Sequence, residues 1–126
     1  MKIIGLGTDI VGIARLHDAL ARHAEHFKKR VYTANELKIA AERNEDTAFY
    51  AGRWAAKEAV SKALGCGMGE HCSFTDVEIL NDACGAPQVT LSGAAANRFD
   101  ALGGRNIHIS VSHERDYAVA TVIITD

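Results

Sequence analysis

The sequence predicts an α+β protein in which a mainly antiparallel sheet packs against one long helix. Two apolar segments, 74–92 and 107–124, are each interrupted by a short turn, which is typical of β-hairpins. Between Asp46 and Gly65 an alanine-rich stripe recurs at helical spacing, which indicates the long helix. Helices and hairpins in this order are typical of the α+β class.

The amino-terminal third is predicted to form a strand followed by two helices. Residues 2–12 are expected to be a strand that ends at a glycine, and residues 13–24 a helix with apolar residues along one side. Thr33 and Glu36 have the T-x-x-E spacing of a capping box, which places a second helix at about 34–43.

Asp46 or Thr47 is expected to cap the long helix, and Gly65 to end it. The elements predicted after it are a strand at 74–80, a turn at 81–87, a partner strand at 88–92, a helix at 93–102 and a hairpin of 107–113 with 117–124.

Length and composition favour a single globular domain spanning residues 1–126. The chain has 126 residues, 48% of them hydrophobic, and one proline. A domain of this size forms clefts for a large ligand more easily between subunits than within one, which is compatible with an oligomer.

The sequence predicts a cytoplasmic protein without a membrane span. Asp9 interrupts the apolar opening run, and no stretch approaches the roughly 18 apolar residues that a span needs. Three cysteines without a C-x-x-C pair fit a reducing compartment better than a disulfide framework. A zinc site of Cys66, His71 and Cys72 is an alternative use of two of them, although structural zinc normally has four ligands.

The formal charge of −2 is unevenly spread. Residues 1–30 contain six Lys or Arg and three Asp or Glu, a net charge of +3, and the remainder carries −5. This asymmetry either steers an acidic partner to the first helix or marks an ordinary solvated helix face. Nucleic acid is not expected as a partner, because there is no chain-wide basic stripe and aromatic residues make up only 6%.

The long helix has a polar half opposite its alanines. At about 100° per residue, Arg53, Lys57, Glu58, Ser61 and Lys62 fall on this half, which is predicted to face outward or into a cleft. A purely structural alternative is an ion pair between Glu58 and Lys62, which have the favourable i,i+4 order.

Asp9 is a charged residue in an otherwise apolar strand. Burying a lone carboxylate is unfavourable unless it finds a cation or hydrogen-bond donors. It can pair with Arg15 or a lysine, or it can join Glu58 around a hard cation. Two carboxylates completed by water and phosphate oxygens are a common arrangement for Mg²⁺.

The segment SVSH at 110–113 ends a predicted strand, where alternation places His113 at the rim of the sheet. A structural histidine is the alternative. A Ser-His hydrolase fits poorly, because no G-x-S-x-G elbow precedes the histidine.

Taken together, GLGTDIVGIAR at 5–15, WAAKEAVSKALG at 54–65 and SVSH at 110–113 resemble, in order and separation, the holo-acyl-carrier-protein synthases of the phosphopantetheinyl transferase superfamily. The resemblance covers essentially the whole chain and implies the phosphopantetheinyl transferase fold. It implies Mg²⁺-dependent transfer of 4′-phosphopantetheine from coenzyme A to a serine of apo acyl carrier protein in fatty acid biosynthesis. Adenosine 3′,5′-bisphosphate is then the second product.

The resemblance also implies roles for individual residues. Asp9 and Glu58 would hold the magnesium ion, and Lys62 would neutralise charge on the phosphate and leaving group; these three would form the catalytic set. Arg53 and His113 would hold the 3′-phosphate of coenzyme A. The full set implied for coenzyme A is Arg53, Ser61, Lys62, Gly65, Gly67, Met68, Gly85, Pro87 and His113.

Family members are typically trimers with sites at subunit interfaces, so Asp9 and Glu58 of one chain would meet Pro87 and His113 of its neighbour. The residues implied for docking of the acidic carrier protein are Arg15, Arg22, Lys28 and Lys29.

Three positions depart from the family pattern. Gly12 replaces a frequent glutamate, Ala86 replaces the lysine of a G-K-P turn, and Trp54 replaces a phenylalanine. They put in doubt an interfacial or partner contact at Gly12 and a basic contribution from the turn. Two other functions fit the residues less well: a non-catalytic module that binds an acidic protein, and another Mg²⁺-nucleotide enzyme. The glycine spacing matches neither a P-loop nor a kinase loop.

Overall fold

The computed structural model describes residues 1–126. Its elements, in chain order, are β1 (Ile3–Gly12), α1 (Ile13–Val31), α2 (Ala34–Glu42), α3 (Thr47–Ala63), the 3-10 turn η1 (Phe74–Asp76), β2 (Val77–Asn81), β3 (Pro87–Leu91), α4 (Gly93–Ala101), β4 (Asn106–His113) and β5 (Tyr117–Thr125). None of the helices is both long and apolar enough to cross a lipid bilayer.

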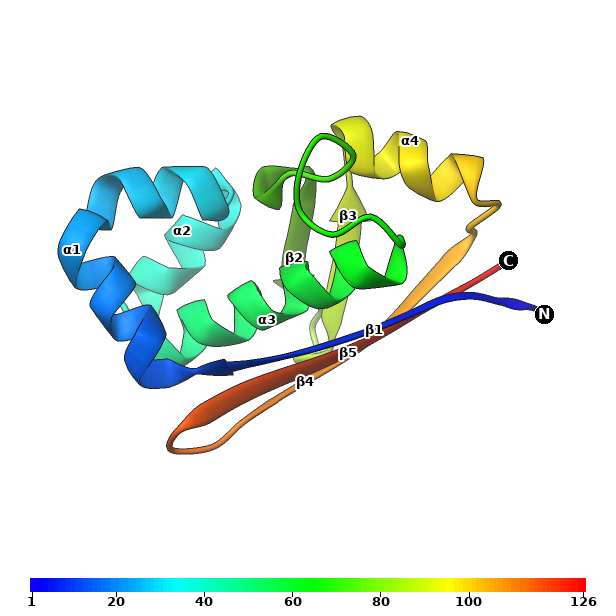
Figure 1. The fold of residues 1–126 in the computed structure, drawn as a ribbon. Helices are drawn as coiled ribbons and strands as arrows, with labels where there is room; N and C mark the ends of the chain where they lie inside the picture. Colours follow the sequence, from blue (N-terminus) through cyan, green and yellow to red (C-terminus); the bar gives the residue numbers. More distant parts are fainter.

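Two antiparallel sheets pack with α3. One has the strand order β1-β5-β4, and the other is the β2-β3 hairpin. Figure 1 shows α3 running along the three-stranded sheet, with α1 and α2 gathered beside the first turns of α3. All four helices lie on the same side of that sheet in this view. The predicted α+β class, with an antiparallel sheet against a long helix, is confirmed.

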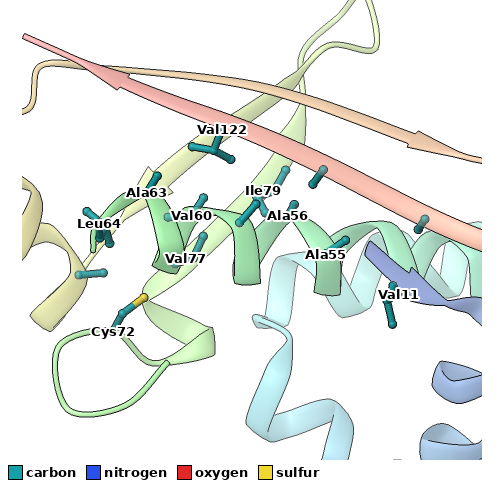
Figure 2. Packing of buried hydrophobic residues seen from close by; sticks show 14 of the residues in the cluster. Val11, Ala55, Ala56, Val60, Ala63, Leu64, Cys72, Val77, Ile79 and Val122 are labelled. Carbon is teal, nitrogen blue, oxygen red and sulfur yellow. The ribbon is translucent and has the colours of Figure 1, made fainter. Parts of the chain in front are cut away.

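Small side chains allow α3 to lie close to its neighbours. Ala55, Ala56 and Ala59 on the helix are fully buried, as are Val122 on β5 and Ile79 on β2. Figure 2 shows Ala55, Ala56, Ile79 and Val122 in the space between α3 and the strands. Short side chains on the helix bring its axis near the strands, so the positions of side chains at its edges are fixed by backbone packing.

Gly5 and Gly7 bring the backbone of β1 very close to that of α3. A Cβ added at Gly7 would lie 1.9 Å from the Ala59 carbonyl oxygen, and one added at Gly5 would lie 1.9 Å from the Ala63 carbonyl oxygen. Only glycine permits this backbone-to-backbone contact. The glycines of the GLGTD segment therefore determine how near the following aspartate lies to the helix.

Gly7→Ala is expected to lower the free energy of unfolding by about 3 kcal/mol, because the overlap is with backbone and cannot be relieved by a rotamer change. Urea denaturation followed by circular dichroism measures the effect. Gly69→Ala is the matched control, since a Cβ there meets nothing within 4 Å. Equal stability of the two variants would show that β1 does not depend on this contact.

The predicted caps are present. Thr33 and Glu36 form the expected capping box of α2, with the Glu36 amide donating to Thr33 Oγ1 at 3.2 Å and the Thr33 amide donating to Glu36 Oε1 at 2.9 Å. Asp46 Oδ1 accepts from the Ala48 amide at 3.0 Å and so caps α3.

The first helix is longer than predicted. The predicted end at residue 24 lies next to a break in the helix at His23, where φ is −141° and ψ is 47°. A second helical segment, which was not predicted, continues from there to Val31. The second part of the helix is held by tertiary packing, since the Phe27 ring stacks on Trp54 with centroids 5.8 Å apart.

The expectation that Lys57 faces outward or into a cleft was also wrong. Its side chain is fully buried, and its Nζ lies 2.7 Å from Glu36 Oε1. Nζ also donates to the Phe74 carbonyl at 3.0 Å and to the Val77 carbonyl, while Glu36 Oε2 accepts from the Ile79 amide at 2.9 Å. A buried ion pair thus joins α2, α3 and β2.

Candidate active site

Asp9 faces the long helix because of strand alternation. Gly7, Asp9 and Val11 share one face of β1, and Asp9 is paired in register with the fully buried Ala120 of β5. Gly7 and Val11 are buried on this face, which packs on α3. The carboxylate therefore stands at the seam between sheet and helix rather than on the open face of the sheet.

Lys62 reaches Asp9 from the last turn of α3. Its Nζ lies 3.0 Å from Asp9 Oδ1 and donates to the Thr8 carbonyl oxygen at 3.0 Å. The Asp9 side chain is 15% exposed and that of Lys62 is 49% exposed. Of the pairings left open by the sequence, the structure shows Asp9 with a lysine, and Lys62 bonds Asp9 rather than Glu58.

The charge of Asp9 affects the pKa of Glu58. Burial raises the pKa of the Glu58 carboxyl above its usual range, the nearby Asp9 carboxylate raises it further, and Lys62 opposes both. Two carboxylates from elements far apart in sequence are thus neighbours, and one ammonium, that of Lys62, is bound to Asp9. Such excess negative charge attracts a cation.

Asp9 and Glu58 line the same cavity, which has a volume of about 300 Å³. The other lining residues are Ile10, Val11, Arg15, Leu16, Ala19, Phe27 and Trp54. The two carboxylates fit a hard divalent ion, which prefers oxygen ligands. No three His, Cys, Asp or Glu side chains are grouped to hold a metal. An ion here would therefore need ligands from water or substrate, as Mg²⁺ commonly uses.

A second cavity, of about 240 Å³, lies elsewhere on α3. It brings together four residues implied for coenzyme A, namely Arg53, Gly85, Pro87 and His113. Its other lining residues are Arg43, Ala48, Phe49, Gly52, Asn81 and Val111. His113 is the last residue of β4, so its predicted place at the rim of the sheet is confirmed.

Arg53 is buried in this second cavity without a carboxylate partner. It is only 6% exposed, its guanidinium lies 4.7 Å from the centre of the Phe49 ring, and its Nη2 donates to Asn81 Oδ1 at 3.1 Å. Its Nε has no acceptor in the protein. Burial lowers the pKa of Arg53, the charge of Glu36 raises it and that of Arg43 lowers it. A cationic pocket of this kind suits an anionic group such as phosphate.

The two cavities lie on different sides of α3. Arg53 and Glu58 are five residues apart, which is about 140° around a helix. The two sets of lining residues have no member in common. One chain therefore separates the carboxylates from the arginine pocket.

Comparison with known proteins identifies the family. Residues 5–122 match the model of the 4′-phosphopantetheinyl transferase superfamily. The chain belongs to this superfamily. The match covers all three motifs on which the resemblance was based, and that prediction is confirmed.

Relatives within the superfamily are similar over nearly their whole length. The chain is 48% identical over 122 residues to a holo-[acyl-carrier-protein] synthase from Vibrio cholerae serotype O1, covering 97% of each chain. It is 46% identical over 124 residues to one from Shewanella amazonensis, covering 98% of this chain and 99% of the relative.

Solved structures of superfamily members have the same fold. The holo-[acyl-carrier-protein] synthase of Neisseria meningitidis superposes with a TM-score of 0.92 at 31% identity, covering 99% of this chain and 100% of that one. The enzyme from Bacillus anthracis, solved in complex with CoA (3′,5′-ADP), gives 0.81 at 37% identity and covers 97% and 96%.

The loop after α3 contains other residues implied for coenzyme A in this superfamily. Gly65 and Gly67 have positive φ angles of 76° and 68°, and their amides donate to the Lys62 carbonyl at 2.9 Å and the Ser61 carbonyl at 3.1 Å. Met68 is half-buried against the core. Ser61 is fully buried and its Oγ donates to the Glu58 carbonyl at 2.7 Å, so its hydroxyl is not on an accessible surface.

Two residues of the arginine cavity, Arg43 and Asn81, were not predicted from the sequence. Arg43 follows α2 and stacks on the same Phe49 ring as Arg53, with 5.2 Å from its guanidinium carbon to the ring centre. Asn81 ends β2 opposite Pro87. Its place beside the predicted turn was a usable signal, whereas Arg43 is brought in only by the packing of α2 on α3.

The basic residues of α1 are not equivalent. Arg15, Arg22 and Lys29 are exposed, and Arg15 also lines the carboxylate cavity. Lys28 is different, because its side chain is 21% exposed and its Nζ lies 2.6 Å from Glu45 Oε1. Glu45 of the same chain thus binds Lys28 in the free protein, and the part of Lys28 in docking stays a prediction.

The cysteines do not form a zinc site. Cys72 is fully buried, and burial raises the pKa of its thiol to about 12, which disfavours the thiolate that zinc requires. His71 lies 3.1 Å from Glu70 instead. All three cysteines are free.

Proposed function

We propose that this chain is a magnesium-dependent holo-acyl-carrier-protein synthase. It transfers 4′-phosphopantetheine from coenzyme A to a serine of apo acyl carrier protein and releases adenosine 3′,5′-bisphosphate, a step that serves fatty acid biosynthesis. The observation that carries the proposal is that Asp9 and Glu58 line one cavity, with Lys62 bound to Asp9, in a member of this superfamily. Relatives that bear this name, one of them solved with coenzyme A, support it.

In phosphoryl transfer, the two carboxylates would bind the metal ion and the lysine would neutralise phosphate charge. Asp9 and Glu58 would hold Mg²⁺, which polarises the diphosphate and offsets the charge that develops on it. Lys62 adds a positive charge for the β-phosphate and the leaving group. Phosphoryl transfer depends mainly on such positioning and charge stabilisation, so the arrangement of the three charges suits the reaction.

The second cavity would bind the 3′-phosphate end of coenzyme A. Arg53 and His113 are the predicted ligands, and Arg43 adds a second guanidinium beside the same ring. The turn residues Gly85 and Pro87 line this cavity and would contact the nucleotide. The loop at Gly65, Gly67 and Met68 would contact it from the α3 side.

Coenzyme A is expected to raise the melting temperature more than dephospho-coenzyme A does, because only the former carries the 3′-phosphate. Arg53→Gln should remove most of the difference, and Arg43→Gln part of it. Differential scanning fluorimetry in Mg²⁺ buffer, with Arg30→Gln as an exposed control, measures this. Equal stabilisation of the wild-type protein by both compounds would contradict the assignment.

We further infer a homotrimer with its sites at subunit interfaces. One chain separates the two cavities, so a ligand that uses both is best bound between neighbouring chains. The outer face of the three-stranded sheet bears no helix (Figure 1) and exposes large apolar side chains. On it Leu6 is 65% exposed and Ile10 is 62% exposed, next to Val119 and Tyr117 of β5. Exposed apolar patches of this kind mark interfaces.

Leu6→Lys is expected to dissociate the trimer and abolish carrier modification, because it places a charge in the proposed interface. Multi-angle light scattering gives the mass of the particle, and Ala41→Lys on the exposed surface of α2 is the control. A fully active monomer, or a trimer that tolerates Leu6→Lys, would overturn this arrangement.

The carrier-docking surface would comprise Arg15, Arg22 and Lys29 on α1, which are exposed and basic, together with Lys28, which is paired with Glu45 in the free protein. A cytoplasmic location fits three cysteines that are all free.

The reaction itself is tested by incubating apo acyl carrier protein with the enzyme, coenzyme A and Mg²⁺ and measuring the mass of the carrier. We expect the added mass of phosphopantetheine, its loss with a chelator, and its return with excess Mg²⁺. An unchanged carrier mass with folded enzyme would reject the function, and transfer that survives the chelator would reject the metal requirement.

A further inference from the structure

We propose that Lys62 is an internal counter-cation, which holds Asp9 while the divalent ion is absent and gives it up when the ion and the coenzyme A diphosphate bind. The role presupposes the proposed function, in which Asp9 and Glu58 hold the ion. Lys62 thereby couples the binding of the divalent ion to that of coenzyme A, so that each raises the affinity of the site for the other.

The contacts of Lys62 place its ammonium on β1. From the end of α3 it spans to Asp9 Oδ1 and to the Thr8 carbonyl oxygen, both at 3.0 Å. It makes no ion pair with Glu58, the carboxylate one turn earlier on its own helix. The ammonium therefore covers one oxygen of the carboxylate that the metal needs, and an incoming ion competes with it.

The local charge explains why the lysine is held there and why it can leave. Asp9, Glu58 and Lys62 together carry one net negative charge when all are ionised. A divalent ion bound by both carboxylates would stand beside the ammonium, and two cations on one carboxylate repel each other. Because Lys62 is 49% exposed on a flexible four-carbon stem, its bonds to β1 are weak enough to exchange for a phosphate oxygen.

The exchange has a thermodynamic consequence. Without coenzyme A, part of the binding free energy of the ion is spent on displacing the ammonium, so the free enzyme binds the ion weakly. With coenzyme A present, the diphosphate offers the ammonium another partner and Asp9 becomes available. Coupling of this kind is reciprocal, so the ion strengthens coenzyme A binding by the same factor.

A Mn²⁺ titration of the folded protein tests the proposal. Free Mn²⁺ is measured by electron paramagnetic resonance without coenzyme A, for wild type, Lys62→Met and the control Lys38→Met. Lys38 is exposed on α2 with no bonded partner among the side chains, and its loss changes the net charge equally. We expect Lys62→Met to bind Mn²⁺ about fivefold more tightly than wild type, and Lys38→Met to bind as wild type does.

A second titration in saturating coenzyme A measures the coupling. The factor by which coenzyme A tightens Mn²⁺ binding should fall about fivefold in Lys62→Met, and Lys62→Arg, which keeps the cation, should retain the weak binding of the free wild-type enzyme. Thermal melting confirms that each variant is folded.

The outcomes separate this role from the proposed function. If the wild type modifies the carrier and binds Mn²⁺, but Lys62→Met binds Mn²⁺ no more tightly than wild type, the counter-cation role is wrong and the function stands. If the wild type neither binds Mn²⁺ nor modifies the carrier, both are wrong.

Discussion

Glu58→Gln is expected to lower kcat/KM for carrier modification by about two to three orders of magnitude, as is typical when a group that stabilises transition-state charge is removed. Glutamine keeps the shape of the side chain but loses the charge that pairs with Asp9 at the metal site. The loss should exceed that of any single exposed cation on α1, since a docking residue contributes to association alone. Steady-state kinetics over a range of Mg²⁺ concentrations measure it.

The same substitution should leave the fold intact. Burial and the charge of Asp9 both disfavour ionised Glu58, so a neutral side chain relieves an unfavourable contact in the metal-free protein. We expect a melting temperature equal to or above that of wild type without metal, and less stabilisation by added Mg²⁺. The control is Glu42→Gln, an exposed carboxylate at the end of α2. Near-normal turnover of Glu58→Gln at ordinary Mg²⁺ would show that Glu58 is not a ligand.

Lys57→Met is expected to destabilise the protein by about 3–5 kcal/mol, because it leaves the charge of Glu36 buried without its partner. Both side chains are fully buried, and their contact is 2.7 Å. The Phe74 and Val77 carbonyls would also lose a donor. Urea denaturation measures the change, with Lys38→Met as the exposed-lysine control.

A double variant isolates the cause. Lys57→Met combined with Glu36→Gln removes both charges and keeps an acceptor oxygen at position 36, so it should recover part of the stability lost in the single variant. A double variant that is less stable than Lys57→Met alone would contradict this explanation, because the burial of an unpaired charge would then not be the main cost.

Local signals in the sequence identified most of the elements. The capping box at Thr33 and the cap at Asp46 act within one turn, and hairpin turns connect strands that are neighbours in sequence, so short segments contain the information. The length of α1 was missed because its second part depends on the stacking of Phe27 on Trp54, which lie in different helices. A kink at His23 further interrupts the helical pattern.

Part of the candidate site was also predicted from signals within short segments of the sequence. Asp9 stood out as a carboxylate in an apolar strand, and the periodicity of α3 placed Glu58 and Lys62 on the polar side. Periodicity predicts on which side of the helix a side chain lies, but not which residues it contacts there. Lys57 is a lysine on the same polar half of the helix as Lys62, yet it is buried and paired with Glu36. Glu36 is also the acidic residue of the capping box of α2.

Long-range packing also sets contacts at the periphery that the sequence did not predict. Lys28 resembled its basic neighbours until the structure placed Glu45 beside it. Arg43 gave no motif, because only the packing of α2 against α3 brings it to the Phe49 ring. Residues whose partners lie more than a turn or a hairpin away could not be assigned from a single sequence.

The central claim is that Asp9 and Glu58 together hold one divalent ion beside the diphosphate of coenzyme A. Crystals grown with coenzyme A and Mn²⁺, measured at the manganese absorption edge, test it most directly. The account predicts one anomalous peak per site, bound by an oxygen of Asp9, an oxygen of Glu58 and phosphate oxygen, with the ammonium of Lys62 moved from Asp9. Manganese bound elsewhere, or Asp9 still paired with Lys62 and excluded from the ion, would contradict it.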